Sequence, residues 1–239
     1  MTTGIELVAG SFTSEARSAA REKLNRLRSR YVVLDADDVD TDQIIPARFL
    51  TTTQRTGLGR FAFYDRRHGT DGTPKRGFPL DAADAAGAQV LVVGRNFGCG
   101  SSREHAVWAL ADAGFRAVIG TSFADIFRAN AYANGLLPVA LPEEAVRALM
   151  RRRAEGADAE VTVDLEARVV TLPSGETIGF DVPPFARHCI LHGVDELEFL
   201  LEAEPERAAY ETDRRVPLDT HAVARATQAP TWSEREADA

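Results

Sequence analysis

The sequence predicts an α/β fold, because short apolar runs alternate with helical segments and turn residues separate them. The apolar runs cover residues 89–93, 117–119 and 136–141. Their continuous apolar character is typical of strands buried on both faces of a parallel sheet. Helices are expected over residues 102–113 and 123–134, where Gly114 and Gly135 would end them. Strands that alternate with helices in this way form a sheet with helices packed on it.

Further elements are expected before and after this core. A short strand is predicted at residues 31–34, ahead of an acidic turn, and a helix at residues 142–151 that starts after Pro142. Two β-type runs at residues 161–165 and 168–172 flank a polar pair and predict a hairpin. A last short helix is expected over residues 195–201.

These elements place one folded domain over residues 31–202. Within it, residues 46–80 are rich in Gly, Arg, Thr and Pro and show no sustained period, which indicates a long loop, and such loops are usually functional. Residues 1–30 are expected to be an extension with a basic helix that runs from Ser14 to residue 30. Residues 203–239 have few apolar side chains and are expected to form a mobile tail.

Composition and charge exclude several classes of protein. The 239 residues are 44% hydrophobic and 27% charged, which is ordinary for a globular chain. The apolar runs are far shorter than the ~20 residues of a membrane span, and no leader resembling a signal peptide opens the chain. The net charge of −8 argues against nucleic acid as a partner. We therefore expect a cytoplasmic protein that binds neither membrane nor nucleic acid.

The cysteine content limits metal binding. Cys99 and Cys189 are the two cysteines, and two thiols cannot supply the ligands that an iron–sulfur cluster or a structural zinc takes from cysteine. We expect no metal and no cofactor in this chain. His188 and Cys189 form a pair near Gly193 that could resemble metal ligands, but without further ligands they are expected to pack in the core.

The densest cluster of candidate functional residues is the segment 94–105, which joins a predicted strand to a predicted helix. Its glycines allow backbone N–H groups to point into one concavity, and a helix N-terminus adds free donors and a positive dipole end. Ser101, Ser102 and Arg103, expected in the first helical turn, would complete an anion site suited to a carboxylate. The glycine spacing matches neither nucleotide-binding pattern. The alternative is an ordinary capped helix after a tight turn, since serine is a common N-cap.

Four motifs carry a family resemblance. GCGSSREHAVWAL resembles the signature of the mobile swivel domain of the aconitase superfamily. Together with VDTDQIIPARFL, SFADIFRANAYANGLLPV and FARHCILHGVDELEF, in that order, it resembles the bacterial small subunits of 3-isopropylmalate dehydratases over residues 32–201. The run Tyr64-Asp65-Arg66-Arg67 departs from the family, which usually has a Trp there. The resemblance implies an α/β, aconitase-type swivel domain, with a mixed β-core and flanking helices.

The resemblance also implies a reaction and a partner. Such subunits interconvert 2-isopropylmalate and 3-isopropylmalate through isopropylmaleate in leucine biosynthesis, and they form a heterodimer with a large subunit that carries a [4Fe–4S] cluster. The two cysteines agree with a cluster held elsewhere. One alternative is the small subunit of a related hydro-lyase acting on homoaconitate, citraconate or a dimethylmalate. Another is a non-catalytic anion-binding module.

The same resemblance implies roles for particular residues. Ser101 would be the catalytic base, and the expected substrate-binding residues are Gly100, Ser102, Arg103, Asp40, Thr41 and Asp42. The segment 40–42 could instead be a capped turn. Gly98, His105 and Asn130 are expected to support the site, His105 through a structural hydrogen bond rather than acid–base chemistry. Cys99 is an alternative nucleophile, and His68 is expected to face solvent.

Overall fold

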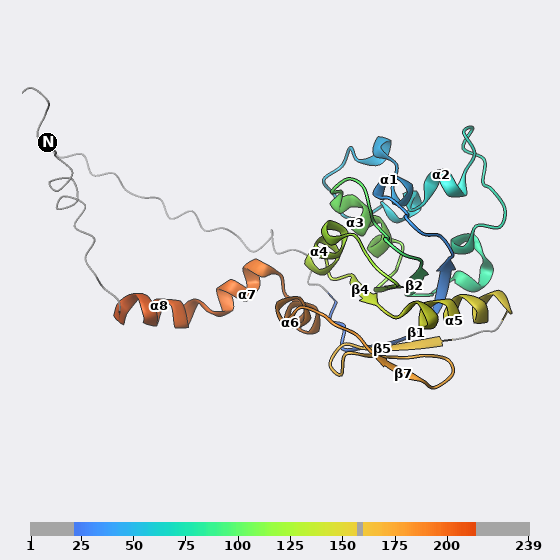
Figure 1. Cartoon of the computed structure of the whole chain (residues 1–239). Coiled ribbons are helices and arrows are strands. Elements are labelled where there is room, and N and C mark those ends of the chain that lie inside the picture. Colours follow the sequence, from blue (N-terminus) through green and yellow to red (C-terminus); the bar gives the residue numbers. More distant parts are fainter. Residues whose placement is uncertain (1–21, 157–159, 214–239) are drawn as a thin grey trace, which may run out of the picture. The chain divides into compact units, whose positions relative to one another are not determined.

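A seven-stranded mixed sheet forms the centre of the computed structural model, which describes residues 22–156 and 160–213 (Figure 1). The strand order is β4-β3-β2-β1-β5-β6-β7. The strands are β1 (Arg26–Leu34), β2 (Val90–Val93), β3 (Ala117–Gly120), β4 (Leu137–Ala140), β5 (Glu160–Asp164), β6 (Val169–Thr171) and β7 (Thr177–Gly179). β1 to β4 are parallel, whereas β5 pairs antiparallel to the first half of β1. The expected mixed β-core is confirmed.

Helices cover both faces of this sheet. The helices of the described residues are α1 (Thr41–Ile44), α2 (Tyr64–Arg67), α3 (Glu104–Asp112), α4 (Asp125–Ala133), α5 (Glu143–Ala154), α6 (Pro184–His192), α7 (Glu196–Glu202) and α8 (Glu204–Asp213). Single 3-10 turns lie at Ala47–Phe49, Gly59–Phe61, Pro79–Asp81 and Ala83–Ala85. The predicted core strands, the hairpin and four predicted helices are confirmed, with ends that shift by a few residues, while β7 was not predicted.

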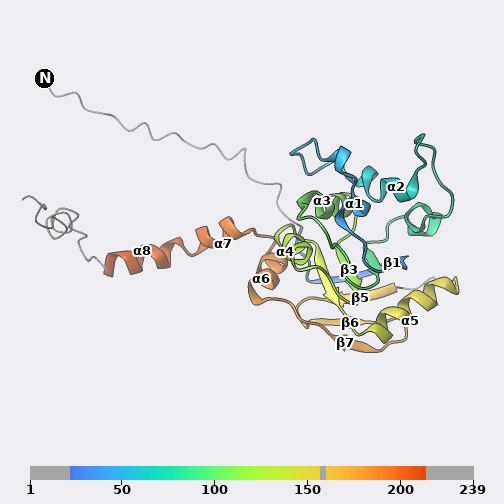
Figure 2. The same ribbon diagram turned by 45° about the horizontal axis from the view of Figure 1, so that its top comes forward.

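Alternate residues of the parallel strands serve two separate cores. In β2, Val90 and Val92 pack on the face covered by α5, whereas Leu91 and Val93 pack on the face covered by α3 and α4. Figures 1 and 2 show α3 and α4 on one side of the sheet and α5 on the other. Burial of a Val or Leu side chain contributes roughly 1.5–3 kcal/mol. The continuous apolar runs are therefore explained by a sheet that is buried on both faces.

The predicted basic helix ending at residue 30 is wrong for its last residues, which form the first half of β1. Residues 26–30 pair with residues 160–164 of β5, so the folded domain also begins earlier than residue 31. Arg26 and Arg28 are exposed while Ser29 is buried, which is the two-residue period of a strand. Residues 14–21 of the predicted helix lie outside the described residues.

The long loop has little regular structure, as predicted, but its side chains pack closely. Phe49 and Phe61 stack with ring centroids 4.1 Å apart, and Tyr64 packs its edge against Phe49. Arg48 forms an ion pair with Asp65 beside these rings. The first part of the loop is therefore fastened to α2 by aromatic contacts, which contribute about 0.5–1.5 kcal/mol per pair beyond burial.

The chain divides into two compact units, residues 1–196 and residues 197–239. The second unit contains α7 and α8, with Leu197, Leu200 and Leu201 more than half exposed. The tail predicted as mobile therefore begins with a helix, α8, and its residues from 214 onward lie outside the described part. Across the described ranges, none of the helices is both long and apolar enough to cross a membrane.

Candidate active site at the carboxyl ends of the parallel strands

Three loops meet where β1, β2 and β3 end. The loop after β2 is tied to the loop after β1, since Gly98 N–H donates to the Val39 carbonyl at 2.7 Å. It is tied to the loop after β3 as well, since Phe97 N–H donates to Ser122 and Ala124 N–H donates to Phe97 at 3.1 and 3.0 Å. Ligands of open α/β sheets bind at this edge, outside the carboxyl ends of the strands.

Gly98 allows the serine loop to approach α4 closely. Its φ is +77°, and a Cβ atom added there would lie 2.2 Å from Cγ of Phe127. Gly100, with φ of +84°, has more room, because its nearest neighbour would be Cβ of Asp40 at 3.4 Å. Gly98 therefore allows the loop to pack against the ring of Phe127, and its support of the site stays a prediction.

The helix after this loop begins later than predicted. α3 starts at Glu104, so Ser101 and Ser102 lie in the loop and Arg103 is the N-cap residue. No side chain caps this helix. Over residues 22–156 and 160–213, no hydrogen bond is found from the amides of Gly100, Ser101 and Ser102, or at either serine hydroxyl. An ordinary capped helix is therefore excluded, and exposed, free donors remain at a positive helix end.

The segment 40–42 lies beside this loop, and its three residues have different contacts. Asp40 caps α1 by accepting from Gln43 N–H at 2.7 Å. Thr41 is only 2% exposed, and its hydroxyl donates to the carbonyl oxygen of Ser101 at 2.9 Å. The carbonyl oxygen of Ser101 also accepts from Arg103 N–H. Thr41 thus fixes the backbone of Ser101 through this hydrogen bond. Direct contact of Asp40 or Thr41 with a substrate stays a prediction.

Arg103 and Asp42 form an ion pair across the site. The side chain of Arg103 is 21% exposed and that of Asp42 is 52% exposed. Because a guanidinium has five N–H donors, it can bind a second carboxylate while it keeps this partner. The structure therefore brings Asp42 to Arg103, which directly follows Ser101 and Ser102, although Asp42 lies far from all three in the sequence.

Cys99 is poorly suited to act as a nucleophile. Burial raises the pKa of its thiol, and the carboxylates of Asp40 and Asp38 raise it further. A raised pKa keeps the sulfur protonated at neutral pH, whereas a thiolate is the reactive form. The alternative of a nucleophilic cysteine is not supported by this environment.

The supporting residues contact other segments. Nε2 of His105 lies 2.9 Å from the carbonyl oxygen of Thr52, which confirms the predicted structural hydrogen bond. Asn130 accepts from Asn134 through its backbone carbonyl. Asn134, which sequence reasoning missed, joins α4 to α3 through its side chain.

His68, His188 and Cys189 belong to other segments of the fold, His68 directly after α2 and the other two in α6. His68 stacks on Tyr64 with ring centroids 4.1 Å apart. His188 stacks on His192 in α6 at 4.2 Å, and Cys189 is buried. In the described ranges, no group of three or more His, Cys, Asp or Glu side chains could hold a metal ion.

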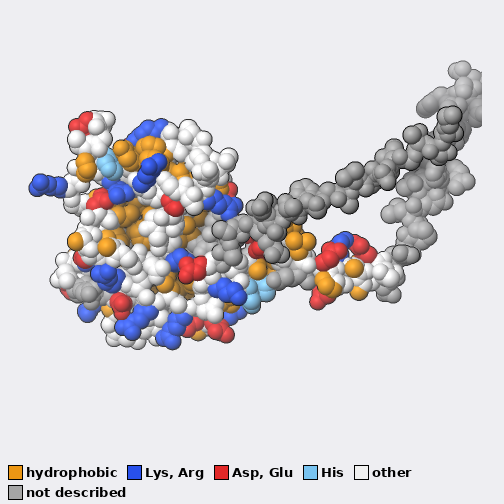
Figure 3. Space-filling view, turned by 180° about the vertical axis from the view of Figure 1, so that it is seen from behind, with side chains coloured by type: hydrophobic (Ala, Val, Ile, Leu, Met, Phe, Trp, Pro, Cys, Tyr) orange, Lys and Arg blue, Asp and Glu red, His pale blue; other side chains and the backbone are white. Residues whose placement is uncertain are grey.

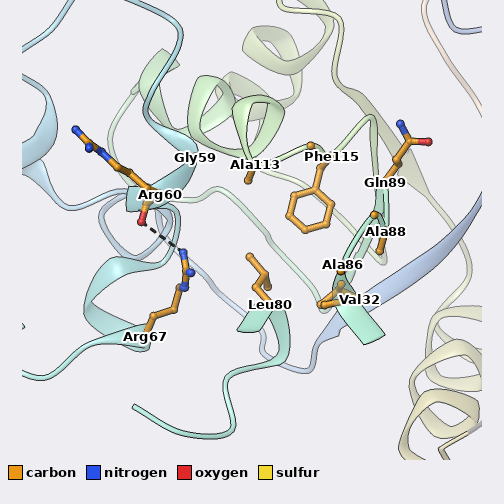
Figure 4. A pocket seen from close by; sticks show the side chains of 13 residues that line it. Val32, Gly59, Arg60, Arg67, Leu80, Ala86, Ala88, Gln89, Ala113 and Phe115 are labelled. Carbon is orange, nitrogen blue, oxygen red and sulfur yellow. Dashed lines mark hydrogen bonds between the residues drawn. The ribbon is translucent and has the colours of Figure 1, made fainter. Parts of the chain in front are cut away.

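A cavity of about 450 Å³ lies at the opposite, amino end of the parallel strands (Figure 4). Leu80 and Phe115 line it, and Arg67 donates to the carbonyl oxygen of Arg60 at 3.4 Å at its edge. The residues that line it do not include Ser101. The candidate site is therefore separate from this cavity.

Comparison with protein families defines the class. A family model described as the aconitase C-terminal domain matches residues 21–144, and a LeuD_N model matches residues 147–184. Together with the mixed sheet and its flanking helices, these matches define an aconitase-type α/β domain.

Individual relatives narrow this class. The 3-isopropylmalate dehydratase small subunit of Anaeromyxobacter dehalogenans is 54% identical over 194 residues, 81% of this chain and all of that protein. That of Chloroflexus aurantiacus is 48% identical over 199 residues, 83% of this chain and 99% of the relative. A crystal structure of 3-isopropylmalate dehydratase (LeuD) from Methanocaldococcus jannaschii matches with a TM-score of 0.56 and 30% identity, over 77% of this chain and 99% of that one. The chain belongs to the family of 3-isopropylmalate dehydratase small subunits.

Proposed function

We propose that this chain is the small subunit of a hydro-lyase that interconverts 2-isopropylmalate and 3-isopropylmalate through isopropylmaleate in leucine biosynthesis. One observation carries the proposal in this family: Ser101 and Ser102 are exposed at an uncapped helix start with free amide groups, beside a partly buried Arg103. These groups suit a substrate that presents a carboxylate next to the carbon that loses a proton.

Each residue has a defined task in this reaction. Ser101, as an alkoxide, takes the proton from the substrate carbon while the C=C bond forms and the C–O bond of the neighbouring carbon breaks. The hydroxyl leaves with the bonding pair as hydroxide, and a proton from solvent converts it to water. Ser102, Arg103 and the Gly100 amide hold one carboxylate. Asp42 holds the guanidinium of Arg103 through their ion pair. Rehydration returns a proton from Ser101 to the other carbon of the double bond.

The energetics indicate why a second subunit is needed. Lowering the pKa of a serine hydroxyl by ~5 units takes roughly 7 kcal/mol, and a helix N-terminus supplies at most about 2 kcal/mol. The remainder has to come from Arg103, the free amides and exclusion of water. Because Ser101 is exposed in this chain, a partner surface is needed to exclude that water.

The partner in this proposal is a large subunit that holds a [4Fe–4S] cluster. Bound there, the cluster would supply a Lewis acid for the departing hydroxyl. The two cysteines of this chain, Cys99 and a buried Cys189, do not fit a cluster that needs at least three thiolates. We infer that the cluster ligands belong to the partner.

The charge distribution argues against nucleic acid as a ligand. Figure 3 shows positive and negative side chains interspersed over one face of the molecule, and the net charge is −8. Nucleic-acid binding would favour a basic stripe. We propose a cytoplasmic enzyme whose partners are the large subunit and a dicarboxylate.

The test is reconstitution of the full chain with the large subunit under anaerobic conditions, followed by an assay of isopropylmaleate hydration. We expect turnover by the mixture and none by either subunit alone. Turnover of a homoaconitate, citraconate or dimethylmalate substrate in its place would assign a related hydro-lyase. Stable association without turnover of any of these would favour a non-catalytic module and contradict the proposal.

A further inference from the structure

Asn134 ends α4 and joins it to two residues of α3. Its Nδ2 donates to Oε1 of Glu104 at 2.8 Å, and its Oδ1 accepts from Nε1 of Trp108 at 3.0 Å. A further bond from Nδ2 to the carbonyl oxygen of Asn130, at 2.9 Å, holds the amide group against its own helix. All three bonds are partly buried, so breaking one would leave a polar group poorly solvated.

The bond to Glu104 acts at the point where α3 begins. Glu104 is the first residue of the helix and directly follows Arg103. Because no side chain caps this helix, the usual local means of fixing its first turn is absent. The amide of Asn134 fixes that turn from the neighbouring helix instead, and it leaves the backbone amides of Gly100, Ser101 and Ser102 free for a ligand.

The first turns of α3 also contact the long loop, residues 46–80. Nε2 of His105 lies 2.9 Å from the carbonyl oxygen of Thr52, and the rings of His105 and Trp108 lie 4.5 Å apart. The guanidinium of Arg55 lies over Trp108, 5.4 Å from the ring centroid. Trp108 therefore contacts the loop with its ring and Asn134 with its Nε1.

We propose that Asn134 is a positioning residue for the reaction proposed above, on which this inference rests. It acts through Glu104 and Trp108 to hold the start of α3, and with it the segment Ser101 to Arg103, in one place relative to α4 and the loop. A displacement of about 1 Å at a reacting group can cost as much as 100-fold in rate. We thus expect loss of the bridge to appear mainly as a lower kcat and less as a lower free energy of unfolding.

Three variants test this role of Asn134: one that breaks the bond to Glu104, one that restores it, and a control. Asn134→Asp keeps the acceptor for Trp108 but replaces Nδ2, the donor to both Glu104 and the carbonyl oxygen of Asn130, by a carboxylate oxygen. Glu104→Gln on that background restores a hydrogen bond with donor and acceptor exchanged, since the new amide can donate to the new carboxylate. Asn25→Asp adds the same charge at an exposed side chain in front of β1.

Two measurements are made on each variant. In the complex with the large subunit, we expect Asn134→Asp to lower kcat for isopropylmaleate hydration by about 10- to 100-fold. The KM should change by less than about threefold. The double variant should recover most of the rate, and Asn25→Asp should match the unaltered chain. In the full chain alone, hydrogen–deuterium exchange of the hydrogen-bonded amides within residues 100–107, such as those of Arg103 and Ala106, should quicken by roughly fivefold or more, without a change in β2.

The outcomes separate this inference from the proposed function. An unaltered complex without hydration activity would overturn the proposed function, while faster exchange over residues 100–107 in Asn134→Asp would still support the positioning role. Unchanged exchange there, or an unchanged kcat in an otherwise active complex, would overturn the role of Asn134. Failure of Glu104→Gln to restore either readout would overturn the bridge as its cause.

Discussion

The close approach of the serine loop to α4 makes Gly98→Ala a sharp test of the packing. The substitution combines two costs. A non-glycine residue at φ of +77° costs about 1–2 kcal/mol. A methyl group placed 2.2 Å from Cγ of Phe127 also forces the ring or the loop to move, which costs about 1–3 kcal/mol. The expected loss is therefore ~2–5 kcal/mol of unfolding free energy, a large fraction of a typical ~5–15 kcal/mol.

Gly156→Ala is the matched control. Its φ is +74°, and nothing lies within 4 Å of an added Cβ atom, so only the backbone cost remains. A loss of 1 kcal/mol lowers Tm by about 2–4 °C in a domain of this size. Thermal melts followed by circular dichroism should show about 2–8 °C lost for Gly156→Ala and clearly more, up to about 20 °C, for Gly98→Ala. Equal losses for the two variants would refute the contact between Gly98 and Phe127.

Three further predictions concern the site. Arg103→Lys keeps the charge but loses the planar fork of the guanidinium, so steady-state hydration kinetics should show a substantially raised KM. Asp42→Asn should raise KM less. An unchanged KM for Arg103→Lys would refute the role of Arg103 in binding a substrate carboxylate. Burial and nearby carboxylates raise the pKa of the Cys99 thiol. Its labelling by a disulfide reagent should therefore be slow at pH 7 and should accelerate as the pH rises above the ordinary pKa of a thiol. Rapid labelling at pH 7 would contradict this environment. Exchange of residues 46–80 for the segment of a homoaconitate enzyme should shift relative kcat/KM between substrates by roughly ten- to a few hundred-fold, the worth of about 1–3 kcal/mol; an unchanged ratio in an active chimaera would assign selectivity to the large subunit.

The central sheet was predictable because its signal is local. The runs that form β2, β3 and β4 are apolar on both faces, and a turn residue ends each helix between them, so no distant contact is needed to recognise them. The first half of β1 lacks such a signal. Its arginines alternate with Leu27 and Ser29, and the pattern becomes a strand because β5, more than 100 residues later, pairs with it.

The site was predictable in its residues but not in their pairing. The serine and arginine motif is contiguous, so a resemblance finds it. The ion pair joins Arg103, at the start of α3, to Asp42 in the short helix α1, and nothing in the local sequence of either segment specifies it. Asn134 was missed for a similar reason, since its partners lie on α3 and only the packing of two helices brings them within hydrogen-bond distance.

The most direct test is the kcat of the reconstituted complex with Ser101→Ala. The Ser101 hydroxyl does not cap α3, so its removal should leave the melting temperature nearly unchanged. It would act only in proton transfer, so kcat for isopropylmaleate hydration should fall by ~100-fold or more while KM stays nearly the same. A near-normal kcat in Ser101→Ala would contradict the assignment of this serine as the base.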